Sequence, residues 1–212
     1  MIIKGEKMFK TIKENVQAEI TEKKSKFICN MYHVESVEEV NDILEKLRKK
    51  YHDARHNCYA YRLIKNNISR SSDDGEPSGT AGIPMLNILN GNDLSNVLVV
   101  VTRYFGGILL GTGGLVRAYS LATTKAIECS EFYEQELGVE VSFLVDYKSL
   151  EEIKYYLNKI GVKITSLDYG EKIKIIAEGS KKNIEKVVNN KISERVKLLD
   201  VAILREKYIC VD

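Results

Sequence analysis

Residues 71–120 read SSDDGEPSGTAGIPMLNILNGNDLSNVLVVVTRYFGGILLGTGGLVRAYS and hold most of the chain's unusual residues. Both prolines and the acidic residues Asp73, Asp74 and Glu76 lie in this stretch. The run LSNVLVVV over 94–101 predicts a strand covered on both faces, because it ends in five consecutive apolar residues, four of them β-branched valines. Five glycines follow within nine residues: Gly106, Gly107, Gly111, Gly113 and Gly114. This density of glycine and proline indicates special backbone dihedral angles, so we expect the rest of the chain to support this segment.

The composition favours two compact domains. A chain of 212 residues has room for one large domain or two small ones, each with its own core. The net charge is +2 and divides equally at Gln135, so any nucleic-acid site must be a local patch. Four cysteines without a CxxC pair favour reduced thiols over a disulfide framework or a zinc site. Because no apolar run is long enough to cross a membrane, we expect a cytoplasmic protein without a membrane partner.

Apolar periodicity predicts the elements on either side of the central stretch. We expect two strands over 11–34, a helix opened by a capping box of Ser36 and Glu39, and strands over 54–64 and 68–72. A short helix is expected over 79–89, with its proline in the first turn. After the glycine loop, Thr112 is expected to cap a further helix.

The pattern restarts after residues 131–136, which predicts a domain boundary there. A strand over 138–147 comes first, followed by a helix with a capping box of Ser149 and Glu152. A hairpin over 162–178, a helix opened by Ser180 and a strand over 196–208 complete the chain. The order βαββαβ is that of the ferredoxin-like sandwich, and this part shows no catalytic constellation.

Arginine is concentrated near the central stretch. The chain has 24 lysines and 8 arginines, but the window 55–117 holds one lysine and five arginines: Arg55, Arg62, Arg70, Arg103 and Arg117. The planar guanidinium binds carboxylate or phosphate bidentately, which lysine cannot do. Two interpretations stay open, since these arginines could pair internally with Asp73, Asp74 and Glu76 or bind an external anion.

The glycine loop has the parts of an anion site, because free N–H groups at a helix start attract phosphate. Gly106 and Gly111 have the spacing of a P-loop, but Thr112 stands where that motif needs lysine, and no GxGxxG is present. An ordinary nucleotide triphosphatase is therefore not indicated, and no cofactor is expected. The alternative is a tight loop that needs glycine for close packing.

Two other clusters allow a catalytic interpretation. Asp73, Asp74 and Glu76 could hold magnesium or act as acid and base, although Gly75 and Pro77 make an exposed turn equally compatible. The HDARH segment at 52–56 lacks the glutamate of the zinc-protease HExxH motif, which leaves a metalloprotease unsupported. Tyrosines such as Tyr104 and Tyr119 could stack on bases or complete a core.

Three blocks in succession resemble the YigZ/IMPACT family: ARHNCYAYRL, SSDDGEPSGTAGIPML and VVVTRYFGGILLGTGGLVRAYS. The resemblance implies an α+β fold of two two-layer α/β sandwiches. Residues 1–134 would have the fold of ribosomal protein S5 domain 2. Residues 135–212 would form a ferredoxin-like domain similar to the last domain of elongation factor G. Eukaryotic IMPACT regulates translation by interfering with activation of the kinase that responds to amino-acid starvation, so the resemblance implies a translation-related role.

These observations favour a cytosolic binding module over an enzyme, with RNA, a ribosome or a translation-related protein as partner. The alternative is a metal-dependent hydrolase that uses Asp73, Asp74 and Glu76. We expect the candidate binding residues to converge on one cleft: His56, Asp73, Asp74, Glu76, Arg103, Tyr104, Gly106, Gly107, Gly111, Thr112, Gly113, Gly114 and Arg117.

Overall fold

The structure, a computed structural model, describes residues 8–189 and 196–211 and divides into two compact units. One unit is Phe9–Tyr133, and the other consists, among the described residues, of Met8 and the chain from Glu134 onward. The division falls inside strand β7 (Phe132–Val145), which starts six residues before the strand expected at Gly138. The residues expected to mark a boundary are therefore part of a continuous strand. Residues 1–7, 190–195 and 212 of the two expected domains lie outside the described part of the chain.

The first unit is built on an antiparallel sheet in the order β2-β3-β6-β4-β5. Its strands are β2 (Val16–Glu22), β3 (Ser25–His33), β6 (Val97–Tyr104), β4 (His56–Leu63) and β5 (Ile68–Ser72). A 3₁₀ turn, η1 (Lys65–Asn67), joins β4 to β5. Strand β6 lies in the centre, as its continuous apolar run predicts, and every residue from Val97 to Arg103 is buried.

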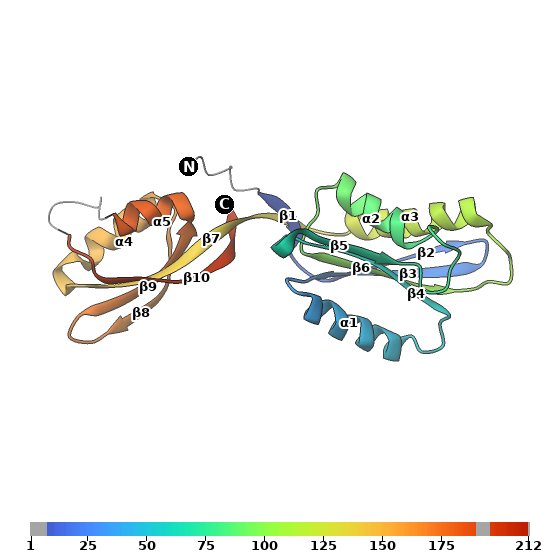
Figure 1. The fold of residues 1–212 in the computed structure, drawn as a ribbon, viewed down its shortest axis with the longest axis horizontal. Coiled ribbons are helices and arrows are strands. Elements are labelled where there is room, and N and C mark those ends of the chain that lie inside the picture. Colours follow the sequence, from blue (N-terminus) through green and yellow to red (C-terminus); the bar gives the residue numbers. More distant parts are fainter. Residues whose placement is uncertain (1–7, 190–195, 212) are drawn as a thin grey trace. The chain divides into compact units, whose positions relative to one another are not determined.

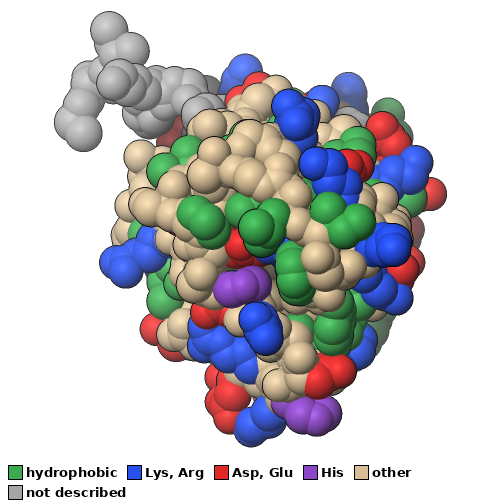
Figure 2. Space-filling view, turned by 90° about the vertical axis from the view of Figure 1, so that its right-hand side faces the viewer, with side chains coloured by type: hydrophobic (Ala, Val, Ile, Leu, Met, Phe, Trp, Pro, Cys, Tyr) green, Lys and Arg blue, Asp and Glu red, His purple; other side chains and the backbone are tan. Residues whose placement is uncertain are grey.

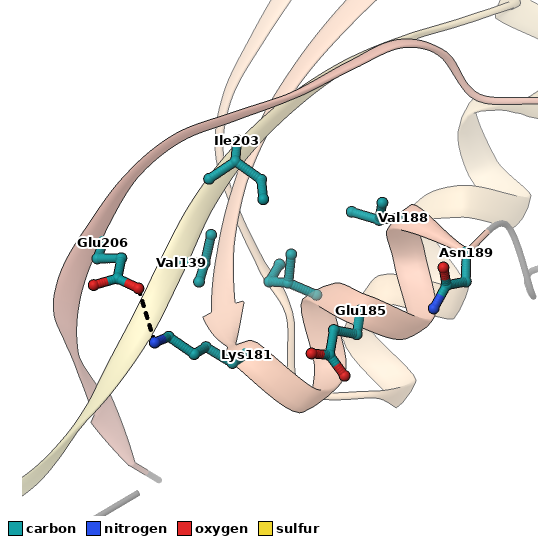
Figure 3. Close-up of a pocket in the computed structure, with 8 residues that line it drawn as sticks. Val139, Lys181, Glu185, Val188, Asn189, Ile203 and Glu206 are labelled. Carbon is teal, nitrogen blue, oxygen red and sulfur yellow. Dashed lines mark ion pairs between the residues drawn. The ribbon is translucent and has the colours of Figure 1, made fainter. Parts of the chain in front are cut away.

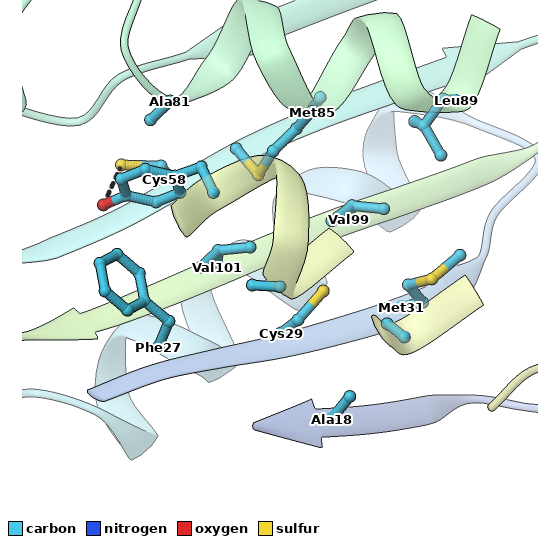
Figure 4. Close-up of a cluster of buried hydrophobic side chains, with 14 of the residues drawn as sticks. Ala18, Phe27, Cys29, Met31, Cys58, Ala81, Met85, Leu89, Val99 and Val101 are labelled. Atoms are coloured by element: carbon cyan, nitrogen blue, oxygen red, sulfur yellow. Dashed lines mark hydrogen bonds between the residues drawn. The ribbon is translucent and has the colours of Figure 1, made fainter. Parts of the chain in front are cut away.

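Helices cover both faces of this sheet (Figure 1). Helix α1 (Val37–Lys50) packs on the face that carries Leu98 and Val100 of β6. Helices α2 (Gly82–Gly91) and α3 (Thr112–Glu128) pack on the face that carries Val97, Val99 and Val101. Figure 4 shows the core between this face and the two helices, where Met85 and Leu89 of α2 pack in the same cluster as Val99 and Val101. The two-layer prediction is wrong for this unit, because the alternating residues of β6 bury apolar side chains on both sides.

The helix starts agree with the sequence in part. Ser36 Oγ accepts the Glu39 N–H, but the Glu39 carboxylate accepts the Glu35 N–H and so does not close the expected box. The expectation that Thr112 caps α3 is wrong, because Gly111 occupies the N-cap position and Thr112 is the first helical residue. Ser149 precedes α4 without a side-chain cap bond, so the second expected box is also absent.

The second unit follows β7 with η2 (Tyr147–Ser149), α4 (Leu150–Lys159), β8 (Lys163–Tyr169), β9 (Ile173–Ser180), α5 (Lys181–Val188) and β10 (Leu199–Val211). In its sheet β10 pairs with β7, β7 with β9, and β9 with β8. Both helices pack on one face around a single core, with Phe143, Ile153 and Ile175 at its centre. Strand β1 (Phe9–Ile12) also pairs with β7, through a contact between distant segments that local periodicity does not indicate. Among the described residues, no helix combines the length and the apolar character required to cross a membrane.

Candidate functional site

The candidate residues lie at one end of the first unit's sheet. The register places Arg103, near the end of β6, between His56 at the start of β4 and Phe27 at the start of β3. Strand β5 pairs with β4 and ends at Ser72, so the acidic loop begins at the same end of the sheet. Figure 2 shows this end, where several hydrophobic side chains lie near a histidine and charged side chains.

A buried ion pair joins two of the candidates. Arg103 Nη1 donates to Glu76 Oε1 at 2.7 Å, and the two side chains are 7% and 3% exposed. Tyr119 Oη donates to the same carboxylate oxygen at 2.8 Å. The Arg103 Nε atom has no hydrogen-bond partner among the described residues. The guanidinium instead lies over two rings, 5.5 Å from the Phe27 centroid and 5.6 Å from that of Phe105. Arg103 therefore pairs internally with Glu76, as the first of the two interpretations predicts.

The thiol of Cys58 extends this network toward α2 and α3. Its Sγ lies 3.3 Å from Tyr119 Oη and 2.9 Å from the Asp73 carbonyl oxygen, and its single proton can be donated to one of these two acceptors at a time. Burial raises the pKa of Cys58 to about 12, and burial also raises the pKa of Tyr119. Both groups are therefore protonated at neutral pH, and the thiol lacks the thiolate character that a nucleophile needs.

Asp73 has a structural role at the start of α2. One carboxylate oxygen accepts the N–H groups of Ala81 and Gly82 at 2.9 and 2.8 Å, and the other accepts that of Gly79 at 2.8 Å. Burial alone would raise the pKa of Asp73, but these three N–H donors lower it below its ordinary value. Asp73 satisfies N–H groups that the helix itself leaves without acceptors.

Asp74 and His56 connect the acidic loop to the start of β4. The Asp74 carboxylate accepts the Asn57 N–H at 2.7 Å, and the Asp74 carbonyl oxygen lies 2.8 Å from His56 Nδ1. Since a carbonyl can only accept, Nδ1 carries the proton and Nε2 is the nitrogen left for another contact. Asp74 and Gly75 both have positive φ, 43° and 86°, so the loop turns sharply here.

The three carboxylates thus have separate partners. Asp73 binds the α2 backbone, Asp74 binds β4, and Glu76 binds Arg103 and Tyr119. Within the described ranges, no group of three or more His, Cys, Asp and Glu side chains is placed to hold a metal. The geometry offers no support for the alternative of a metal-dependent hydrolase.

The glycine loop packs on the turn between β2 and β3. The Gly106 N–H donates to Ser25 Oγ at 3.1 Å, and a Cβ at Gly106 would lie 2.0 Å from the Lys24 carbonyl carbon and oxygen. Only glycine fits this approach. The loop then exposes apolar side chains, with Phe105 47% and Leu109 82% exposed.

The start of α3 leaves backbone donors without helical acceptors. The first helical bond runs from the Leu115 N–H to the Gly111 carbonyl at 2.9 Å, and no side chain caps the helix. The N–H groups of Thr112, Gly113 and Gly114 precede it and have no intrahelical partner. Arg117 is exposed four residues after Gly113, on the same side of α3.

Tyr104 and Arg117 lie outside the buried network. Tyr104 Oη donates to Asp53 at 2.7 Å, and this bond is the main reason that the pKa of Tyr104 rises to about 12. Arg117 forms no ion pair within the residues that the structure describes. The acidic loop therefore brings two groups of candidates together. Asp74 contacts His56, and Asp73 binds the start of α2. Glu76 binds Arg103.

Sequence reasoning did not select Lys23 and Lys24, which form the turn that supports the glycine loop. Glu22 pairs with Ser25, so the two lysines are a two-residue hairpin turn with φ of 45° and 64°. Positive φ at both positions is typical of a type I′ turn, for which Asn-Gly is preferred. Both lysines are exposed, and neither forms an ion pair within ranges 8–189 and 196–211. The signal in the sequence was a Lys-Lys pair between two alternating runs.

The second unit contains a pocket of about 320 Å³ between α5, β7 and β10. Figure 3 shows Val139, Val188 and Ile203 around it, with an ion pair of Lys181 and Glu206 at its edge. The lysine and the glutamate compensate each other at 2.8 Å. None of the sequence-selected residues lies there.

Comparison with known proteins identifies the family. Residues 23–127 match the model of the Impact N-terminal domain. IMPACT family member YvyE of Bacillus subtilis is 38% identical over 164 residues, which is 77% of this chain and 76% of the relative. Protein IMPACT homolog of Dictyostelium discoideum is 43% identical over 113 residues, which is 51% of this chain and 32% of that protein. A solved crystal structure of a hypothetical protein is 31% identical, with a TM-score of 0.64, and covers 91% of this chain and 96% of its own. Since a bacterial relative of this identity is matched over three quarters of its length, the chain belongs to the IMPACT family.

Proposed function

We propose that this protein is a cytoplasmic, translation-related regulatory module that binds RNA at the glycine-loop end of its first domain. The resemblance to eukaryotic IMPACT supports the translation-related role. In the same proposal, residues 1–134 have the fold of ribosomal protein S5 domain 2. Residues 135–212 are ferredoxin-like and similar to the last domain of elongation factor G, which accords with the element order of β7 to β10.

The Lys23–Lys24 turn carries the RNA part of the proposal. A non-glycine residue in the left-handed region costs roughly 1–2 kcal/mol, and asparagine and glycine avoid most of that cost. Here two lysines occupy both positions, exposed and without an ion pair among the described residues. Strain retained at charged, exposed positions favours a binding role for those side chains.

Other groups nearby extend the same chemistry. The N–H groups at the start of α3 attract phosphate, and Arg117 is exposed one turn further along the helix. These cationic and N–H groups come from the β2–β3 turn and from α3, and they are spread along a surface. Such an arrangement suits a chain of phosphates better than a single small anion.

Salt dependence of RNA binding tests the proposal. The full-length protein should bind a fluorescein-labelled 20-nucleotide RNA, with an affinity that falls linearly on a log–log plot against salt. A variant with Lys23→Gln and Lys24→Gln should reduce the magnitude of that slope by about 1.4, since each phosphate contact of a single strand contributes about 0.7.

The matched control changes two exposed lysines of the second domain, Lys148→Gln and Lys159→Gln, with the same loss of charge. This control should leave both affinity and slope unchanged. Equal slopes for the two double variants, or an RNA affinity independent of salt, would refute the proposed site.

A further inference from the structure

We propose that Phe105 is a stacking platform for an unpaired base, so that the ligand of this surface is single-stranded RNA. This inference rests on the proposed function and specifies its ligand class. It begins from the Arg103 guanidinium, whose central carbon lies over the Phe27 ring, 5.5 Å from its centroid, and over the Phe105 ring, 5.6 Å from its centroid. Phe27 is fully buried and Phe105 is 47% exposed, so Arg103 connects a ring of the core to a ring at the surface.

Buried side chains fix the position of the Arg103 guanidinium. Glu76 fixes the Arg103 guanidinium at 2.7 Å, and Tyr119 donates to the same oxygen of Glu76. The Tyr119 ring in turn meets the Phe27 ring edge-on, with centroids 5.3 Å apart and an interplanar angle of 87°. An exposed ring with this support is already ordered before a ligand arrives, which reduces the entropy lost on binding.

Among the described residues, Arg103 Nε has no hydrogen-bond acceptor, which indicates that the ring contacts decide the position of this side chain. A buried donor without an acceptor is costly, and few are found in native proteins. Here the guanidinium lies over two aromatic rings while Nε has no hydrogen bond among the described residues, so the position of Arg103 favours the ring contacts over that bond. The result is an aromatic surface backed by a cation.

The surroundings favour a base as the occupant. Gly106 follows Phe105 and packs on the Lys24 backbone, so the exposed ring lies next to a turn whose two lysines form no ion pair with the residues that the structure describes. Bases stack on aromatic side chains with gains of about tenfold or more in affinity per base. Within a duplex both faces of a base are covered by its neighbours, so only unpaired nucleotides can use this platform.

Tryptophan fluorescence provides a direct test, because the chain contains no tryptophan. In the Phe105→Trp variant, a 12-nucleotide oligouridylate should quench the emission of the single indole, and a duplex of the same length should not. Leu109→Trp is the matched control, since Leu109 lies in the same loop and is 82% exposed. Its emission should change little.

A second variant measures the contribution to affinity. Phe105→Leu keeps an apolar side chain at an exposed position but cannot stack, and it should bind the oligouridylate about tenfold more weakly. Leu109→Ala should bind as tightly as the unaltered protein. Unchanged circular dichroism melting of both variants would show that folding is not the cause.

The outcomes separate this inference from the proposed function. If Phe105→Leu binds the single strand as tightly as the unaltered protein while the Lys23/Lys24 variant binds more weakly, the stacking role is wrong and RNA binding stands. Equal affinity for duplex and single strand would also overturn the stacking role. If the unaltered protein binds no RNA, the proposed function itself fails. If Phe105→Leu and Leu109→Ala lose the binding of a protein partner to the same extent, the surface is a protein-docking site and the stacking role is wrong.

Discussion

Arg103 Nη1 lies 2.7 Å from Glu76 Oε1, and both side chains are almost completely buried. Sequence reasoning left two roles open for the arginines of this region, and Arg103 takes the internal one. Its pair is not isolated, because Tyr119 donates to the same carboxylate oxygen. The charge of Arg103 is therefore compensated inside the domain, and an external anion must be bound by other groups, such as Lys23, Lys24 and Arg117.

Breaking the buried pair should be strongly destabilising. Arg103→Met removes the guanidinium but keeps the aliphatic stem, and it leaves Glu76 charged and buried with only the Tyr119 hydroxyl as donor. We expect the domain to lose about 3 kcal/mol of its free energy of unfolding. Hydrogen exchange of the buried β6 amides measures this domain alone and should accelerate by about a hundredfold or more.

The double variant Arg103→Met with Glu76→Leu should recover part of that loss, since no unpaired charge remains. Lys26→Met is the surface control within the same domain, because Lys26 pairs with Glu19 at 2.7 Å but is 46% exposed. Its loss should be below about 1 kcal/mol. A strictly additive double variant would show that the two side chains do not interact.

One substitution at three glycines should give three different results. Gly106→Ala places a Cβ 2.0 Å from the Lys24 backbone, which cannot move without shifting the hairpin, and should destabilise by several kcal/mol. Gly107→Ala meets no atom but forces φ of 84° on alanine, at a cost of about 1 kcal/mol. Gly113→Ala also meets no atom and lies inside α3, so it should stabilise by up to about 1 kcal/mol. The order of the three exchange rates at β6 tests the assignment, and it fails if Gly106→Ala is the mildest.

The central strand and the helices of the first domain could be predicted from periodicity, because residues 97–101 of β6 are all apolar and α1 has a clear apolar stripe. The third layer conflicts with the two-layer fold implied by the family resemblance, although the apolar run itself predicts a strand covered on both faces. The start of α3 was misassigned to Thr112, since a threonine before an apolar stripe is a typical cap, whereas the φ of 71° at Gly111 ends the preceding loop by backbone conformation alone.

The site was less predictable, because its contacts join distant segments. The acidic residues suggested a metal or acid–base cluster, yet each binds a different element, and nothing local indicates that Asp73 caps a helix that begins at Gly82. Cys58 and Tyr119 meet across 61 residues. Lys23 and Lys24 were overlooked because a lysine pair in a turn usually indicates only a solvated surface.

Asp73 should make the stability of the first domain sensitive to acid. Its pKa is lowered in the folded protein by the N–H groups of Gly79, Ala81 and Gly82, which outweigh burial. A lowered folded pKa means that the stabilisation is complete above the unfolded pKa of about 3.9 and is lost as pH falls through the folded value. Asp73→Asn should cost about 1–2 kcal/mol at pH 7, and its deficit relative to the unaltered protein should shrink between about pH 4 and pH 2.

Melting temperatures by circular dichroism across this pH range measure the effect. Asp42→Asn is the matched control, since Asp42 is exposed on α1 and should leave the whole pH profile unchanged. A constant deficit for Asp73→Asn from pH 7 to pH 2 would mean that the ionised carboxylate is not what stabilises the start of α2.

The Lys23–Lys24 turn allows stability and binding to be moved in opposite directions. Lys23→Asn with Lys24→Gly gives the sequence that a type I′ turn prefers, so the domain should gain about 1 kcal/mol and its β6 amides should exchange about fivefold more slowly. The same variant loses two exposed charges beside the glycine loop and should bind RNA several-fold more weakly at 100 mM salt. A purely structural turn predicts the gain in stability with no change in affinity.

Lys23→Gln with Lys24→Gln separates the two effects, because it removes the charges while both residues still have side chains at positive φ. It should weaken RNA binding without the gain in stability. Tighter binding by the Asn-Gly variant would contradict a role for these lysines in holding RNA.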